Sequence, residues 1–267
     1  MRRKLLGPNH VDVAESLHSL GNLKARQRRY SEAEPLFRQS LEILRTRSGP
    51  NDSNVQQELG YLGRTLAAEE KWAEAETVLN QAIAMQERFE GDGADTSSSL
   101  HSLVQCLEHQ GRTSEAEAML TEAVQRKRKF PGCGDSLAVP LLLELSDLLK
   151  SQGKLPESVA ALRDAADLGD PRAQTALGWT FATSADPRLR NGSNAVLFAE
   201  KAAAATSRTN SSALETLAAA YAETGDFARA ISTQTEAMLL SKGDTANQDY
   251  AIRLKLYESK KPYHEAE

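Results

Sequence analysis

Apolar residues recur along this chain at helical spacing, and the pattern itself repeats. Leucines lie three positions apart, as Leu17 lies before Leu20 and Leu59 before Leu62, and small residues follow them at set distances. Apolar side chains spaced i, i+3 and i+4 share one face of a helix. The pattern therefore predicts an all-α protein whose repeating unit is a helix, a tight turn, a second helix and a longer loop.

The length of the repeat can be measured from the alanine of the sequence Glu-Ala-Glu. Six repeats place a small residue in this column, at steps of 42, 41, 42, 37 and 35 residues: Ala33, Ala75, Ala116, Ser158, Ala195 and Ala230. Seven residues later each repeat has a second small residue: Ser40, Ala82, Ala123, Ala165, Ala202 and Ala237. Small residues let two helices approach closely. A single repeat cannot bury its own apolar face, so neighbouring repeats must stack.

Turn signals set the boundaries of the repeats. We expect six repeats at about residues 11–48, 53–90, 96–130, 136–168, 171–206 and 211–241, and a capping helix at about 245–259. Together they are predicted to form a single solenoid over residues 1–267. The turn of the fifth repeat carries about five extra residues, within ADPRLRNG.

Glycine marks the end of the first helix in three repeats. Gly111, Gly153 and Gly225 are at the position where a helix commonly ends in the left-handed conformation. Arg28 and Glu70 occupy this position in the first two repeats, where we expect slightly weaker caps.

The columns resemble the tetratricopeptide repeat. In the first repeat the matching residues are Leu17, Leu20, Gly21, Ala33, Phe37 and Ser40. The 42-residue form, with GPNHVDVAESLHSLGNL and YSEAEPLFRQSLEI, is similar to the repeats of kinesin light chain and of its bacterial relatives. The C-terminal part resembles the end of bacterial tetratricopeptide arrays, some of which follow serine/threonine kinase domains. The resemblance implies a right-handed α-solenoid that serves as a protein–protein interaction scaffold.

The beginning of the sequence looks incomplete as a repeat. MRRKLL, before Gly7, resembles the end of a second helix whose first helix is missing. We therefore expect this chain to be part of a longer array. The alternative function is a regulatory or targeting region of a larger bacterial enzyme, such as a serine/threonine kinase, with catalysis outside this chain.

Composition narrows the choice of partner. Aromatic residues make up 5% and hydrophobic residues 40% of the chain, which favours helices packed through small residues. A net charge of −5 gives no general attraction to nucleic acid or to an anionic membrane. Cys106 and Cys133 are too few for a disulfide framework, and no apolar run is as long as a membrane span. We expect a soluble, cytoplasmic protein without a cofactor.

The repeated Glu-Ala-Glu sequence first suggests an acid/base pair. Glu32 and Glu34, however, are two positions apart on a helix and point about 200° away from each other. Ser31-x-x-Glu34 matches a capping box, in which serine and glutamate bond to each other's backbone amides, and Ser114-x-x-Glu117 matches it again. We interpret the motif as the beginning of a helix.

Patterns typical of enzymes and metal sites are missing from the sequence. The histidines have no Cys or Asp at ligand spacing, and there is no phosphate-binding loop, nucleophile elbow or kinase signature. We therefore predict no catalytic residues and no metal ion. The basic run 126–129 is interpreted as a solvated helix end and not as a nucleic-acid surface.

The resemblance places the first helix of each repeat along a groove that takes extended or helical peptides. By column, the predicted peptide contacts in the first three repeats are His18, Asn22, Arg26, Tyr61, Arg64, His101, Gln105 and His109. Later repeats offer Asp147, Lys150, Trp179 and Glu215. Amide side chains can hold a peptide backbone, and arginine can bind a carboxylate. The expected partner is a protein or peptide, unless these positions are only the solvated sides of helices.

Overall fold

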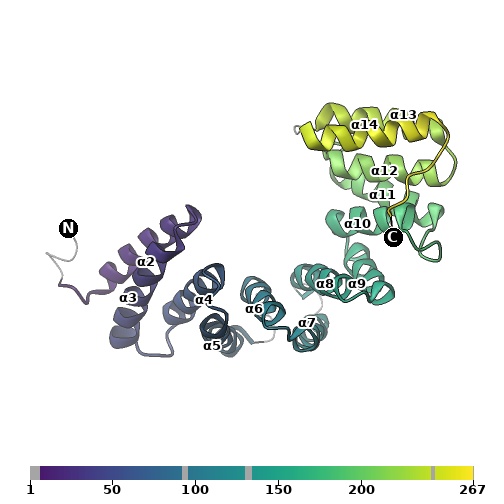
Figure 1. Ribbon diagram of the computed structural model, residues 1–267. Helices are drawn as coiled ribbons and strands as arrows, with labels where there is room; N and C mark the ends of the chain where they lie inside the picture. Colours follow the sequence, from purple (N-terminus) through teal and green to yellow (C-terminus); the bar gives the residue numbers. More distant parts are fainter. Residues whose placement is uncertain (1–6, 92–95, 130–133, 242–243, 267) are drawn as a thin grey trace. The chain divides into compact units, whose positions relative to one another are not determined.

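The computed structural model describes residues 7–91, 96–129, 134–241 and 244–266 (Figure 1). Within these ranges there are thirteen helices and no strand, so the predicted all-α class is confirmed. Residues 1–144 and 145–267 form two compact units, which we call the N-terminal unit and the C-terminal unit. Each is described by itself. A single solenoid over residues 1–267 therefore stays a prediction.

The helices follow one another in pairs. The pairs are α2 (Val11–Arg26) with α3 (Tyr30–Ser48), α4 (Ser53–Ala68) with α5 (Trp72–Glu90), α6 (Ser97–His109) with α7 (Thr113–Arg128), α8 (Gly134–Ser151) with α9 (Leu155–Asp167), α10 (Pro171–Thr183) with α11 (Gly192–Ala205), and α12 (Ser211–Glu223) with α13 (Phe227–Leu240). The boundary between the two units falls inside α8. A final helix, α14 (Asp244–Glu258), packs on α13.

The small-residue columns lie where the two helices of a pair meet. All six residues of the first column are at most 3% exposed. In the second column only Ala123 is less than fully buried. At Gly63 an added Cβ would lie 2.7 Å from the Leu79 side chain, and at Gly21 it would lie 2.9 Å from the Phe37 ring. These distances leave no room for a methyl group, so the close approach predicted from the sequence is present.

The turns inside the pairs adopt the expected conformation. Gly111, Gly153 and Gly225 have φ of 74°, 75° and 81°, and Arg28 and Glu70 share the left-handed region with φ of 58° and 61°. A side chain in this region costs about 1 kcal/mol relative to glycine. The turn between α10 and α11 spans residues 184–191, five residues more than the three-residue turns such as 27–29, which confirms the expected insertion.

The predicted capping boxes are wrong. The N-cap residues of α3 and α7 are Arg29 and Arg112, and neither side chain bonds to the backbone of its helix. The tight turn has a fixed length, so α3 begins one residue before Ser31 and α7 one residue before Ser114. Each serine is therefore the second residue of its helix, too late to cap it.

The glutamate of the motif instead binds the neighbouring repeat. Oε2 of Glu34 accepts a 2.5 Å hydrogen bond from Nζ of Lys71, and Oε1 accepts one of 2.7 Å from Arg38. Partial burial acts to raise the pKa of Glu34, but these hydrogen bonds outweigh it and lower the pKa to about 2. Glu76, one repeat later, accepts a 2.8 Å hydrogen bond from Arg112 in the same way. The recurring carboxylate thus joins consecutive repeats.

Two expectations fall outside the described residues. They concern residues 1–6, predicted as the end of a preceding helix, and Cys133.

Candidate functional site

Two of the predicted peptide contacts in the N-terminal unit link successive first helices. Nδ1 of His18, on α2, lies 2.6 Å from Oε2 of Glu58 on α4. Nδ1 of His101, on α6, lies 2.6 Å from Oε2 of Glu144 on α8. Burial raises the pKa of Glu58, and the hydrogen bond of His18 only partly offsets this. The hydrogen bond of Glu144 raises the pKa of His101.

Tyr61 and Arg64 line a polar hollow of about 410 Å³ in the N-terminal unit. The Arg64 guanidinium lies over the Tyr61 ring, 4.6 Å from its centroid, and Nη1 donates to Oγ of Ser98 at 3.2 Å. The hollow is also lined by Gln56 and Gln57, so its surface offers amide and hydroxyl groups. Such groups suit a peptide backbone more than an apolar side chain.

The other four predicted contacts of the N-terminal unit are more scattered. Asn22 is half-buried on α2, and Arg26 and Gln105 are exposed on α2 and α6. His109, at the end of α6, stacks on the ring of Trp72 in α5, with centroids 4.1 Å apart and planes 8° apart. This stack uses one face of the imidazole and anchors α6 to the preceding pair.

The basic run at the end of α7 does not form an open basic patch. Arg126 forms 2.6 Å ion pairs with Glu87 and Glu122, and Lys127 is only 5% exposed. These two cations are therefore engaged within the repeats, and the predicted solvation of the helix end is wrong for Lys127.

The described ranges hold no cluster of three or more His, Cys, Asp or Glu that could bind a metal ion. Burial raises the pKa of the Cys106 thiol to about 11, so little thiolate forms at neutral pH. In the same ranges no helix combines the length and the apolar character needed to cross a membrane.

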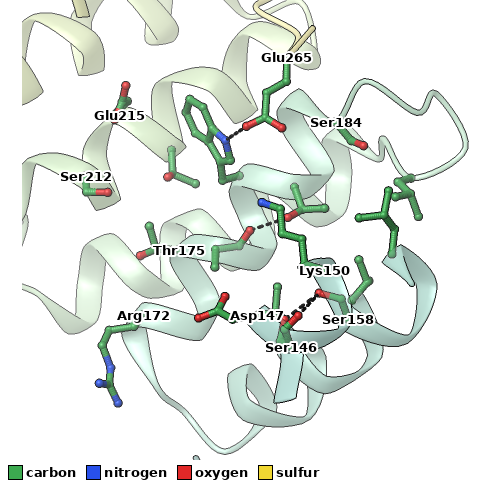
Figure 2. Close-up of a pocket in the computed structure, with 18 of the residues that line it drawn as sticks. Ser146, Asp147, Lys150, Ser158, Arg172, Thr175, Ser184, Ser212, Glu215 and Glu265 are labelled. Atoms are coloured by element: carbon green, nitrogen blue, oxygen red, sulfur yellow. Dashed lines mark hydrogen bonds between the residues drawn. The ribbon is translucent and has the colours of Figure 1, made fainter. Parts of the chain in front are cut away.

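The C-terminal unit contains a larger cavity of about 900 Å³ (Figure 2). Its lining comes from α8, α9, α10, the loop 184–191, the segment before α12 and the beginning of α12. The four positions predicted for the later repeats all line it: Asp147, Lys150, Trp179 and Glu215. In this unit the groove-facing columns therefore surround one cavity.

The cavity combines hydroxyl groups and aliphatic side chains with six charged residues: Asp147, Lys150, Arg172, Asp186, Glu215 and Glu265. Thr175 and Thr180 stand on α10, while Leu155 and Val159 come from α9. The Lys150 side chain is exposed and, within the described part of the chain, forms no hydrogen bond or ion pair. Figure 2 shows it directed toward the middle of the lining residues. A flexible ammonium group in such surroundings can bind a carboxylate of a ligand.

The segment that follows α14 lies against one edge of this cavity. The backbone N–H of Glu265 donates to the carbonyl oxygen of Thr183 at 2.8 Å, and its Oε1 accepts a 2.8 Å hydrogen bond from Nε1 of Trp179. The Tyr263 ring lies near the same indole, with centroids 6.0 Å apart. In Figure 1 this segment runs from the end of α14 back to α10.

Arg253 of α14 holds the two aromatic rings together. Its guanidinium lies 5.0 Å from the Trp179 centroid and 4.7 Å from the Tyr263 centroid, and it forms an ion pair with Glu215. Sequence reasoning missed Arg253 because it treated the final helix only as a cap, and it missed Tyr263 and Glu265 because it stopped at the end of that helix. The available signal was Lys261-Pro262-Tyr263, since proline ends a helix and a tyrosine ring beyond that end can pack on a neighbouring surface.

Known proteins match the chain in part of its sequence and in its fold. The tetratricopeptide repeat family model matches residues 1–46 and 58–129. No curated protein matches by sequence. The crystal structure of BtubC (BKLC) from P. vanneervenii is similar with a TM-score of 0.52 and 14% identity, covering 90% of this chain and 82% of that one. TTC0263, a thermophilic TPR protein of Thermus thermophilus, gives a TM-score of 0.43 at 16% identity, covering 92% and 98% of the two chains.

The family match covers the first three helix pairs, and the likeness to BtubC concerns the fold alone. The later pairs show the same buried small-residue columns and the same helix-turn-helix order as the matched ones. The first three helix pairs therefore match the tetratricopeptide repeat, the helix pair of a generic protein-interaction scaffold, and the later described pairs share its helix-turn-helix order.

Proposed function

We propose that the chain binds a peptide or a partner protein through the cavity of the C-terminal unit, and that it performs no chemical reaction itself. The observation that carries the proposal is this cavity of about 900 Å³, which gathers Asp147, Lys150, Trp179 and Glu215 from three successive first helices. An apolar and hydroxyl-rich cavity with a few charged groups is a common form of ligand site.

Lys150 gives the cavity its chemical preference. Among the cations of the described lining, Lys150 forms no hydrogen bond or ion pair, whereas Arg172 is bonded to Asp170. The lining acid Asp186 is bonded to Arg188. A ligand that brings a carboxylate to Lys150 gains a charge-assisted hydrogen bond in a partly enclosed site. The proposed partner segment therefore carries an acidic side chain among small or aliphatic ones.

The predicted contacts of the N-terminal unit belong to the same proposal as a secondary surface. Tyr61 and Arg64 line the polar hollow there, and Asn22, Arg26 and Gln105 present polar groups on first helices. Their role as peptide contacts stays a prediction.

The proposal can be tested by comparing the proteins captured from a cell extract by three forms of the chain. These are the wild type, the Lys150→Glu variant and a matched Lys255→Glu variant, which reverses an exposed lysine on α14 outside the cavity lining. We expect at least one partner of the wild type to be retained by Lys255→Glu and lost from Lys150→Glu. Identical sets of partners for all three forms, with unchanged folding by circular dichroism, would contradict a role for the cavity.

A further inference from the structure

The segment after α14 contacts the C-terminal unit as an extended peptide would contact a receptor. Side chains of an extended chain point alternately to opposite sides. Tyr263 and Glu265 both contact Trp179, whereas the intervening His264 places its Nε2 2.8 Å from Oε2 of Glu223 on α12. A backbone hydrogen bond from Glu265 to Thr183 fixes the register. Backbone bonding combined with alternate side-chain contacts is the usual mode of extended-peptide recognition.

The side chains that receive this segment are Trp179, Arg253 and Glu215, which supply an aromatic ring, a cation and a carboxylate. Trp179, Arg253 and Tyr263 form a ring–cation–ring stack, and the indole N–H of Trp179, the one donor of its side chain, bonds to the Glu265 carboxylate. Glu215 compensates the charge of Arg253. The site therefore selects an aromatic residue followed two positions later by an acid.

The segment leaves much of its receptor unused. Among its described residues only Glu265 lines the cavity, whose remaining lining includes Lys150 and the hydroxyl groups of α10. Nε of Arg253 is buried and has no acceptor within the described ranges. A longer peptide that begins with the same contacts can continue into the cavity and gain interactions that residues 262–265 do not make.

We propose that residues 262–265 are a built-in ligand of the C-terminal unit. An extended segment of a partner protein, with an aromatic residue and an acidic residue two positions later, displaces them and continues toward Lys150. This inference rests on the proposed function and adds the chemical pattern of the peptide. Because residues 262–265 are tethered directly to α14, their effective concentration at the site is high, on the order of millimolar. Competition from them weakens the binding of any outside peptide.

The probe for this inference is a fluorescein-labelled peptide with the sequence of residues 259–266, SKKPYHEA. Its affinity would be measured by fluorescence anisotropy for the full-length wild type, for Tyr263→Ala/Glu265→Ala and for a Lys261→Ala control. The control changes an exposed side chain in the same segment. We expect the double variant, whose own segment is released, to bind the peptide at least about 10-fold more tightly than the other two forms.

A double-mutant cycle locates the bound peptide. Trp179→Phe in the released variant removes the indole N–H but keeps an aromatic ring. This substitution should lower the affinity for the peptide that contains the glutamate. The affinity for a peptide with alanine at that position should not change. Circular dichroism and the Tm of each variant establish that the fold is intact.

Three results would overturn the inference. One is equal, weak binding of the peptide to all forms, which would make residues 262–265 a fixed structural segment. Another is a Trp179→Phe effect that is the same for both peptides. The last is concentration-dependent self-association of the wild type that disappears in the double variant, which would assign the site to the segment of a second copy. If only the peptide assay fails while Lys150→Glu still loses a partner, the proposed function stands and this inference alone is wrong.

Discussion

Single glycines control how closely the paired helices approach. Gly63 faces the Leu79 side chain and backbone across the α4–α5 contact, whereas Gly60, on the same helix, has only Oγ of Ser99 within reach of an added Cβ, at 3.8 Å. Both glycines are helical, so alanine improves the intrinsic helix propensity equally at the two positions. The difference in stability between the two alanine variants therefore measures the effect of packing alone.

We predict opposite effects of alanine at these two positions. Gly60→Ala should stabilise the protein by up to about 1 kcal/mol, because helix propensity improves without a clash. Gly63→Ala should destabilise it by about 1 kcal/mol or more, because a methyl group 2.7 Å from Leu79 forces the two helices apart. Urea unfolding followed by circular dichroism measures both. A stabilising Gly63→Ala would show that the approach of α4 and α5 is looser than described.

The residue scale also shows where sequence reasoning succeeds and where it fails. Glu32 and Glu34 bind different cations, Arg29 and Lys71, as expected from the helical angle between them, which is a local property. The interpretation of the Glu-Ala-Glu motif as a capping box was wrong, because the partner of Glu34 is Lys71 in the next repeat. Contacts between repeats depend on the register of stacking, which a local motif does not specify.

At the scale of the helices, equivalent columns make equivalent contacts. The His18–Glu58 and His101–Glu144 pairs each tie a first helix to the following first helix at 2.6 Å. The sequence placed both histidines in one column but expected them to face a ligand. Instead, one ring nitrogen of each histidine is bonded to a glutamate of the following helix pair and is not available to a ligand. The pairs therefore contribute to the packing of the repeats as well as to the surface.

The His101–Glu144 pair predicts a pH dependence of stability. The pKa of His101 is raised in the folded protein by its hydrogen bond to Glu144, above its value of about 6.5 in the unfolded chain. The stabilisation is therefore complete below about pH 6.5 and is lost as the pH rises through the folded pKa. The His101 side chain is 53% exposed, so solvent screens the pair and the effect is small.

Urea unfolding between pH 5 and pH 8 checks this prediction. The wild type should exceed Glu144→Gln in stability near pH 5 to 6, and the difference should shrink toward pH 8. In the NMR titration, the midpoint of His101 should be lower in Glu144→Gln than in the wild type. If wild type and Glu144→Gln differ in stability by the same amount at every pH, Glu144 does not raise the pKa of His101 on folding, and the prediction is wrong.

At the scale of the whole molecule, periodicity predicts architecture better than it predicts the site. The helix pairs, the buried small-residue columns and the longer turn at 184–191 follow from a repeated pattern. The columns also placed Lys150, Trp179 and Glu215 at one surface. The segment that binds this surface breaks the repeat. Its contacts join Glu265 to Trp179 across 86 positions of the chain, which no periodic pattern encodes.

The central claim is that a partner occupies the cavity of the C-terminal unit. Its most direct test is photo-crosslinking of the full-length chain in cells, with benzoylphenylalanine placed at Ser212 on the cavity lining or at Ala228, an exposed position on α13. The account predicts a crosslinked partner from Ser212 that is absent from Ala228 and disappears when Lys150→Glu is added. The same crosslinks from both positions, or none from Ser212, would contradict it.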